Sequence, residues 1–260
     1  MANFNAPANI AEAVMSKVGV SKCKLGFWKV IILGILAGAF IAFGAELATR
    51  MGALITFDKG ISILVFGSVF SVGLMLVVIA GAELFTGNNL MFMSVLNGEA
   101  KIGSMLWKWL LVYLANFVGS MILVWFMYSS GLVSGAVADK AIGIAAAKVN
   151  LDFGPAFFRA IMCNWLVCLA VWLALASHDV VGKIFGIFFP IMAFVASGFE
   201  HSIANMYFIP IGIFLDQTGS ITWAGFFKNI IPVTLGNIVG GAGFVATLYW
   251  IVFKKCKVSE

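Results

Sequence analysis

Six long apolar runs follow one another along this chain, separated by short polar segments. They cover residues 26–49, 61–97, 105–130, 155–176, 184–215 and 229–253. A helix needs roughly 20 apolar residues to cross the hydrocarbon core of a bilayer, and inside that core every backbone polar group must be paired within the protein. Only 10% of the residues are charged, against about 25% in ordinary soluble domains. The sequence therefore predicts an all-α, multi-pass integral membrane protein.

Two of the six runs, the second and the fifth, contain polar and small residues where a membrane helix should be apolar. The segment 81–89 includes Glu83, and the segment 197–205 includes Glu200 and His201. Charged and amide side chains at membrane depth are costly unless they line a pathway or are buried in protein. We therefore expect helices two and five to be interrupted there, and the interruptions to mark a substrate route.

An internal repeat relates the two halves of the chain. Residues 114–119 in the third run match residues 235–240 in the sixth, and Glu83 and Glu200, each two residues after a glycine, occupy matching places in the second and fifth. Each half then contributes three spans. Because three is odd, the second half must enter the membrane inverted, which predicts a 3+3 inverted repeat with a pore or binding site between the two interrupted helices.

Small residues recur at helical spacing in the first and sixth runs, at Gly34 and Gly38 and at Gly236 and Gly240. This spacing lets helix backbones approach closely. We expect it to serve packing within one subunit.

The basic residues predict the orientation. Ten fall on the side that holds both ends of the chain: Lys17, Lys22, Lys24, Lys29, Lys101, Lys108, Lys183, Lys254, Lys255 and Lys257. Six fall on the other side: Arg50, Lys59, Lys140, Lys148, Arg159 and Lys228. The positive-inside rule places both termini in the cytoplasm. The net charge of +5 thus reflects the excess of basic residues on the cytoplasmic side of the membrane, and it does not indicate a nucleic-acid partner.

Three regions are predicted along the chain. Residues 1–25 form a cytoplasmic region with an amphipathic helix at 9–20, which begins at a cap made by Asn9 with Glu12 and acts either as a surface anchor or as a gate. Residues 26–253 form the six-helix channel domain, with a long outside loop at 131–154. Residues 254–260 form a cytoplasmic tail.

Four segments resemble the formate/nitrite transporter family, which includes formate, nitrite and hydrosulfide channels. They are residues 81–87, 164–172, 196–206 and 232–237, and the resemblance extends over essentially the whole chain. It implies an aquaporin-like fold, a homopentamer with one pore per subunit, and passage of small monovalent anions through the bilayer.

The same resemblance implies roles for individual residues. Thr86 and His201 match the polar residues at the pore centre, and Lys148, Asn164 and Asn237 match residues along the route or around its mouths. The positions at or near the apolar constrictions are Phe70, Leu74, Leu84, Phe85 and Phe194. Glu83 and Glu200 occupy equivalent repeat positions, and we expect them to brace the broken helices by accepting backbone N–H bonds.

These features together predict a channel or proton-coupled transporter for weak-acid anions in the cell inner (plasma) membrane. Formate is the first candidate and hydrosulfide a close second, with nitrite as the alternative within the family. An anion loses its hydration between apolar rings, so proton donation or a strong hydrogen bond from His201 would let it cross. An intramembrane enzyme using Glu200 and His201 is a weaker alternative, because no second intramembrane histidine, metal-ligand set or nucleophile–base spacing accompanies them, and no cofactor is expected.

Overall fold

The computed structural model describes residues 4–254, and the regular secondary structure of this part of the chain is helical apart from one antiparallel bridge between Phe4 and Ser177. Three uninterrupted membrane helices are α3 (Phe27–Leu54), α7 (Ile102–Ser129) and α9 (Phe153–Ala176). The last span joins α12 (Trp223–Ile238), the π-helical η4 (Val239–Thr247) and α13 (Leu248–Phe253). These spans and the all-α membrane architecture confirm the predicted fold class. Most of the predicted tail at 254–260, with Lys255 and Lys257, lies outside the described residues.

The second and fifth spans are interrupted. The second consists of α4 (Lys59–Phe70), α5 (Val72–Met75), η2 (Leu76–Gly81), η3 (Gly87–Met91) and α6 (Phe92–Leu96). The fifth consists of α10 (Val180–Ala196) and α11 (Ser202–Leu215). Gly81 and Gly198 stand at the two breaks with φ of 89° and 72°, a left-handed conformation that glycine adopts without a steric cost.

One further bend, at Ser71 between α4 and α5, is absent from the prediction. Here α3 approaches closely, because a Cβ on Gly44 would lie 2.6 Å from the carbonyl oxygen of Phe70. The Ser71 hydroxyl donates to the carbonyl of Phe188 on α10 at 3.2 Å. Tertiary contacts of this kind leave no mark in the hydrophobic pattern.

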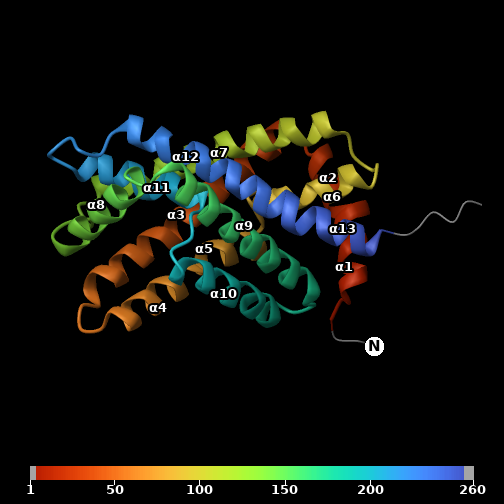
Figure 1. Ribbon diagram of the computed structural model, residues 1–260, viewed down its shortest axis with the longest axis horizontal. Helices are drawn as coiled ribbons and strands as arrows, with labels where there is room; N and C mark the ends of the chain where they lie inside the picture. Colours follow the sequence, from red (N-terminus) through yellow and green to blue (C-terminus); the bar gives the residue numbers. More distant parts are fainter. Residues whose placement is uncertain (1–3, 255–260) are drawn as a thin grey trace, which may run out of the picture.

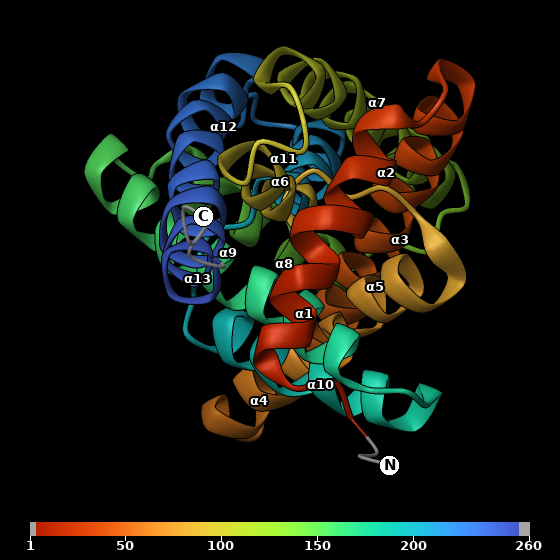
Figure 2. The same cartoon turned by 90° about the vertical axis from the view of Figure 1, so that its right-hand side faces the viewer.

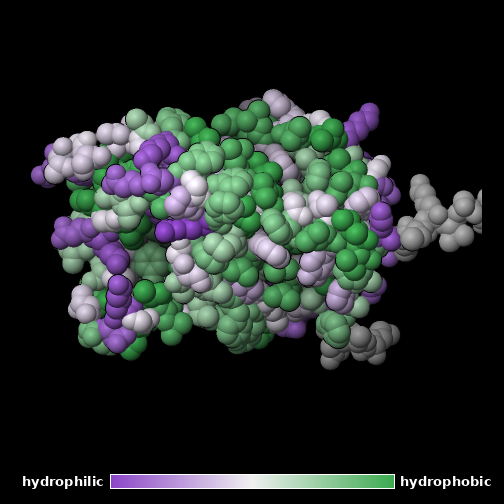
Figure 3. All heavy atoms as spheres, in the orientation of Figure 1, coloured by the Kyte–Doolittle hydropathy of each residue, from purple (hydrophilic) through white to green (hydrophobic). Residues whose placement is uncertain are grey.

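The two halves of the chain run in opposite directions. Helix α3 leads from the end of the molecule that holds α1 toward the end that holds α8, and α9 leads back (Figure 1). Hydrophilic residues gather toward these two ends, and the surface between them is mostly hydrophobic (Figure 3). We call the α8 end the outer end and the α1 end the inner end.

Glycines allow the closest helix crossings. A Cβ on Gly38 of α3 would lie 1.9 Å from the Asn116 carbonyl oxygen on α7, and one on Gly240 would lie 2.2 Å from that of Ile161 on α9. Both contacts are within the subunit, as the spacing of the glycines predicts.

A helix over residues 7–24 crosses the inner end of the bundle (Figure 2). It comprises α1 (Pro7–Ala13), η1 (Val14–Val18) and α2 (Gly19–Lys24). The predicted cap is wrong, since the helix begins at Pro7 after Ala6 and has Asn9 and Glu12 inside it. Its apolar face is buried in a cluster with Met93 and Trp172, so it packs on the protein.

The segment predicted as an outside loop at 131–154 contains the helix α8 (Ala136–Val149). Its buried residues Val137, Ala141, Ala145 and Val149 recur every four positions, which is helical spacing. Lys148 therefore projects from the last turn of a helix.

We expect Gly38→Ala to lower the stability of the folded protein by about 1–3 kcal/mol, because the added methyl must displace the backbone of α7. Gly143→Ala on α8 is the matched control: no atom lies within 4 Å of the position of its Cβ, so helix propensity should leave stability unchanged or slightly raised. Melting temperatures of both variants in detergent check this. Equal melting of both variants and the wild type would contradict the close crossing.

Candidate substrate pathway

Three cavities lie in series between the two broken helices. The outer cavity has a volume of about 150 Å³, the central cavity about 10 Å³ and the inner cavity about 490 Å³. The central volume is close to the space that one water molecule needs. An anion passing from end to end would thus meet two wide chambers and one narrow, largely apolar chamber.

The residues shared between neighbouring cavities define two junctions. Leu74 and Leu84 line both the inner and the central cavity, whereas Phe70, Phe194 and His201 line both the central and the outer cavity. Four of the five predicted constriction residues therefore lie at a junction. The fifth, Phe85, packs its ring against Trp109 and Tyr113 with centroid distances of 6.0 and 4.9 Å, and it does not line these three cavities.

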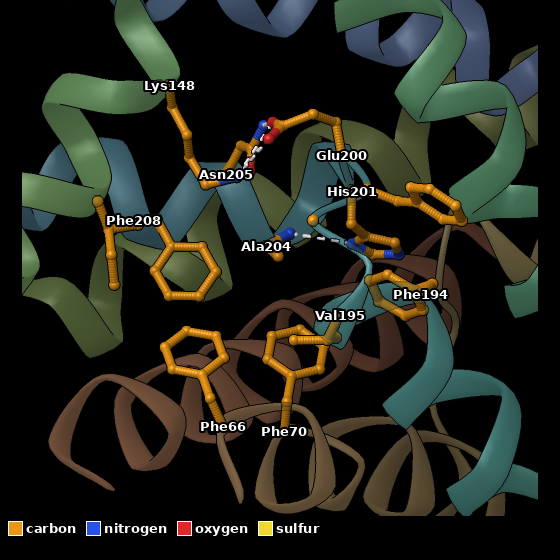
Figure 4. Close-up of a pocket in the computed structure, with 13 residues that line it drawn as sticks. Phe66, Phe70, Lys148, Phe194, Val195, Glu200, His201, Ala204, Asn205 and Phe208 are labelled. Atoms are coloured by element: carbon orange, nitrogen blue, oxygen red, sulfur yellow. Dashed lines mark hydrogen bonds and ion pairs between the residues drawn. The ribbon is translucent and has the colours of Figure 1, made fainter. Parts of the chain in front are cut away.

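His201 caps the start of α11, and this cap orients its ring. The backbone N–H of Ala204 donates to Nδ1 at 3.1 Å, as Figure 4 shows. Nδ1 is thus an acceptor, so a neutral imidazole carries its proton on Nε2. Nε2 lies 2.9 Å from Oγ1 of Thr86 on the other broken segment. The Nε2–H of His201 donates to Oγ1 of Thr86, so the hydroxyl hydrogen of Thr86 remains free to donate to another group.

Two asparagine side chains hold the backbone at the two breaks in the same way. Asn116 on α7 donates to the carbonyls of Gly34 and Glu83 at 2.8 and 2.9 Å and accepts from the N–H of Phe85 at 3.0 Å. Asn237 on α12 donates to the carbonyls of Ala160 and Glu200 at 2.8 and 3.0 Å and accepts from the N–H of Ser202 at 2.9 Å. Asn116 was not among the predicted site residues, although the repeat at 114–119 pointed to it.

Glu83 and Glu200 also have matching partners. Glu83 accepts from Lys22 at 2.6 Å and from the Asn88 side chain at 2.7 Å. Glu200 accepts from Lys148 at 3.0 Å and from the Asn205 side chain at 2.6 Å. The predicted partners, backbone N–H groups, are therefore wrong, since lysine and asparagine side chains take that place.

Each wide chamber thus contains a lysine paired with a glutamate. Lys148 lies in the wall of the outer cavity with its Nζ 5.4 Å from the centroid of the Phe208 ring, and Lys22 lies in the wall of the inner cavity. Lys22 was counted among the cytoplasmic basic residues but was not among the predicted site residues. The internal repeat was the signal that could have indicated it. If Glu200 is paired with a lysine, the equivalent Glu83 is expected to be paired with a lysine as well.

Asn164 and Asn237 lie behind the pathway. The Asn164 side-chain nitrogen lies 3.2 Å from the Thr86 carbonyl oxygen and 2.7 Å from that of Asn237. Neither residue lines the three cavities. Their contact with substrate stays a prediction, and their geometry is that of residues that position the backbone. In the part of the chain that the structure describes, no group of three or more acidic, cysteine or histidine side chains could hold a metal ion.

Comparison with known proteins gives a consistent result. Residues 8–251 match the family model described as formate/nitrite transporter. A probable formate transporter of Methanothermobacter thermautotrophicus is 50% identical, over 97% of this chain and 98% of that protein. The formate channel BtFdhC of Bacillus thuringiensis is 42% identical, over 97% of each chain. A solved structure described as a pentameric formate channel with formate bound superposes with a TM-score of 0.80 at 35% identity, covering 88% of this chain and 98% of that one.

We expect Asn237→Ala to destabilise the protein and abolish transport. It leaves the Glu200 carbonyl and the Ser202 N–H without their partner, and each buried unpaired group costs about 1–3 kcal/mol. Asn150→Ala is the control, because that exposed side chain donates only to the Ala146 carbonyl of its own helix. Melting temperature and anion uptake in liposomes check both. Normal uptake by Asn237→Ala would show that the break does not need this amide.

Proposed function

Because this chain belongs to the formate/nitrite transporter family, whose members are transporters and channels, we propose that it is a membrane channel or transporter for small monovalent weak-acid anions. Formate is the first candidate substrate, since relatives at 50% and 42% identity are named for formate. Hydrosulfide is the second and nitrite the alternative, because both share formate's single charge and small size. The alternative of an intramembrane enzyme is excluded, because the members of this family are transporters and channels.

The observation that carries this proposal is His201 in the wall of the central cavity, together with Thr86, which lines none of the three cavities but contacts His201 through Oγ1 at 2.9 Å. Apart from His201, the side chains that line this cavity are apolar, and they cannot replace the hydration of an anion. Transfer of an unpaired ion to such surroundings costs on the order of tens of kcal/mol. A hydrogen-bond donor at the narrowest point is therefore the feature on which anion passage depends.

The hydrogen bonds of His201 favour one of the two predicted mechanisms. A neutral ring with its proton on Nε2 has no second proton to give. A charged ring would carry a second proton on Nδ1, but Nδ1 already accepts a hydrogen bond from the Ala204 N–H. We therefore infer that His201, which lines the central cavity, stabilises the substrate by hydrogen bonding through its Nε2–H, and that Thr86, which contacts this nitrogen at 2.9 Å, orients the ring. A proton that neutralises the anion then comes from the solution on the more acidic side.

The ten-to-six distribution of basic residues supports an orientation with both termini in the cytoplasm and a location in the plasma (inner) membrane. We also propose that the protein assembles as a homopentamer with one pore per subunit, since a solved structure at 35% identity is described as a pentameric formate channel.

Replacing His201 tests the central step. His201→Phe should reduce formate uptake by proteoliposomes about tenfold to a hundredfold, the effect of losing a hydrogen bond to a charged group. Thr86→Val should give a smaller loss, because the imidazole remains. Wild-type uptake should rise as the external pH falls, and this rise should persist in His201→Phe, because the proton comes from the solution. His178→Phe, at the exposed inner loop, is the control. Equal formate uptake rates for His201→Phe and the wild type would assign His201 a structural role only.

Trimming a junction should speed passage and weaken size selection. Phe194→Ala and Leu84→Ala each widen one end of the central cavity, so less hydration is lost on crossing. Phe189→Ala is the matched control, because this ring lies on the same helix as Phe194 and is 56% exposed. Stopped-flow measurement of formate and acetate flux checks the prediction. If both trimmed variants keep the wild-type flux and selectivity, these residues serve only the packing of the core.

A further inference from the structure

A second buried polar cluster lies outside the three cavities. The Tyr207 hydroxyl on α11 donates to Oε2 of Glu46 on α3 at 2.6 Å, and Nη2 of Arg50 donates to Oε1 of the same carboxylate at 2.9 Å. Glu46 is 7% exposed and Tyr207 is fully buried. None of these three residues lines the pathway.

A charged side chain inside a membrane helix is costly and is therefore usually retained for a function. The carboxylate of Glu46 is compensated by two donors from different elements. Arg50 reaches further, since its Nη2 also donates to the Leu132 carbonyl after α7 at 3.2 Å. The cluster thus ties α3, α11 and the segment that follows α7 at one point near the outer end.

The position of Tyr207 matters because of the next residue. Successive residues of a helix point about 100° apart, so a fixed Tyr207 fixes the direction of Phe208. The Phe208 ring lines the outer cavity and stacks on Phe66 and Phe70, with centroid distances of 6.3 Å and interplanar angles of 21° for both pairs. Figure 4 shows Phe208 facing these two rings across the cavity.

Phe70 in turn meets the ring of Phe194 edge-on, with centroids 5.9 Å apart, and both line the central and outer cavities. A continuous series of contacts therefore leads from Glu46 through Tyr207, Phe208 and Phe70 to the outer junction.

We propose that the hydrogen bond between Tyr207 and Glu46 is a specificity-determining clamp for the outer junction. It holds Phe208 against Phe70 and so keeps the junction narrow enough to exclude anions larger than formate. Glu46, Arg50 and Tyr207 are positioning residues, because they act through the aromatic rings and do not touch the substrate. This inference rests on the proposed transport function.

The test compares acetate with formate uptake in the same proteoliposomes. Acetate is a monovalent weak-acid anion one methyl group larger than formate. A purely structural effect would lower the amount of active protein and scale both rates equally, which leaves their ratio unchanged. A loosened junction instead raises the acetate-to-formate ratio.

Tyr207→Phe removes only the hydroxyl and should raise this ratio about fivefold, the effect of one hydrogen bond. Glu46→Gln keeps the shape of the side chain and should raise it less. Tyr128→Phe is the control, because this tyrosine lies on α7 with its ring against Phe214 and is 49% exposed.

The outcomes separate the two proposals. If the wild type takes up no formate, hydrosulfide or nitrite, the proposed function fails. If the wild type transports formate and Tyr207→Phe keeps the wild-type acetate-to-formate ratio, the clamp alone is overturned. A raised acetate-to-formate ratio in Tyr207→Phe, together with the wild-type ratio in Tyr128→Phe, supports the clamp.

Discussion

Two side-chain amides hold the backbone where two membrane helices break, and the pathway depends on them. At each break the chain leaves helical geometry at a depth where no lipid group can pair with a carbonyl or an N–H. Asn116 and Asn237 supply those partners, each contacting both the neighbouring helix and the broken segment. Only because the backbone is paired in this way can Glu83, Thr86, Glu200 and His201 occupy the middle of the molecule.

The inverted repeat gives two equivalent supports, but the chemistry at the centre is unequal. Glu83 and Glu200 are 117 residues apart, and the same offset relates Thr86 to Ile203 and His201 to Leu84. Each half thus contributes one polar residue where its partner half has an apolar one. The symmetric scaffold brings these two polar residues into a single hydrogen bond of 2.9 Å, with apolar residues on both sides.

Much of this organisation could be predicted from the sequence, since apolar runs, their interruptions and the internal repeat are local or periodic signals. The helical nature of 136–149 was missed because a short amphipathic helix between two spans resembles a polar loop. Lys22 and the Glu46–Tyr207 contact were missed for another reason: the partners are 61 and 161 residues apart, and side-chain pairing at such separations depends on how helices pack. The Ser71 bend likewise follows from a close approach of α3.

The lysine that neutralises Glu83 belongs to the segment that precedes the first membrane helix. That segment packs through Ile10 and Val14 into a cluster with Trp172 of α9 and, from the last span, Tyr249. The same segment also contacts the first half, where the Ser94 hydroxyl donates to the Val14 carbonyl at 3.0 Å. The countercharge of the first-half carboxylate thus sits on a segment that both halves of the chain hold in place, so detachment of this segment would leave Glu83 without the lysine that neutralises it.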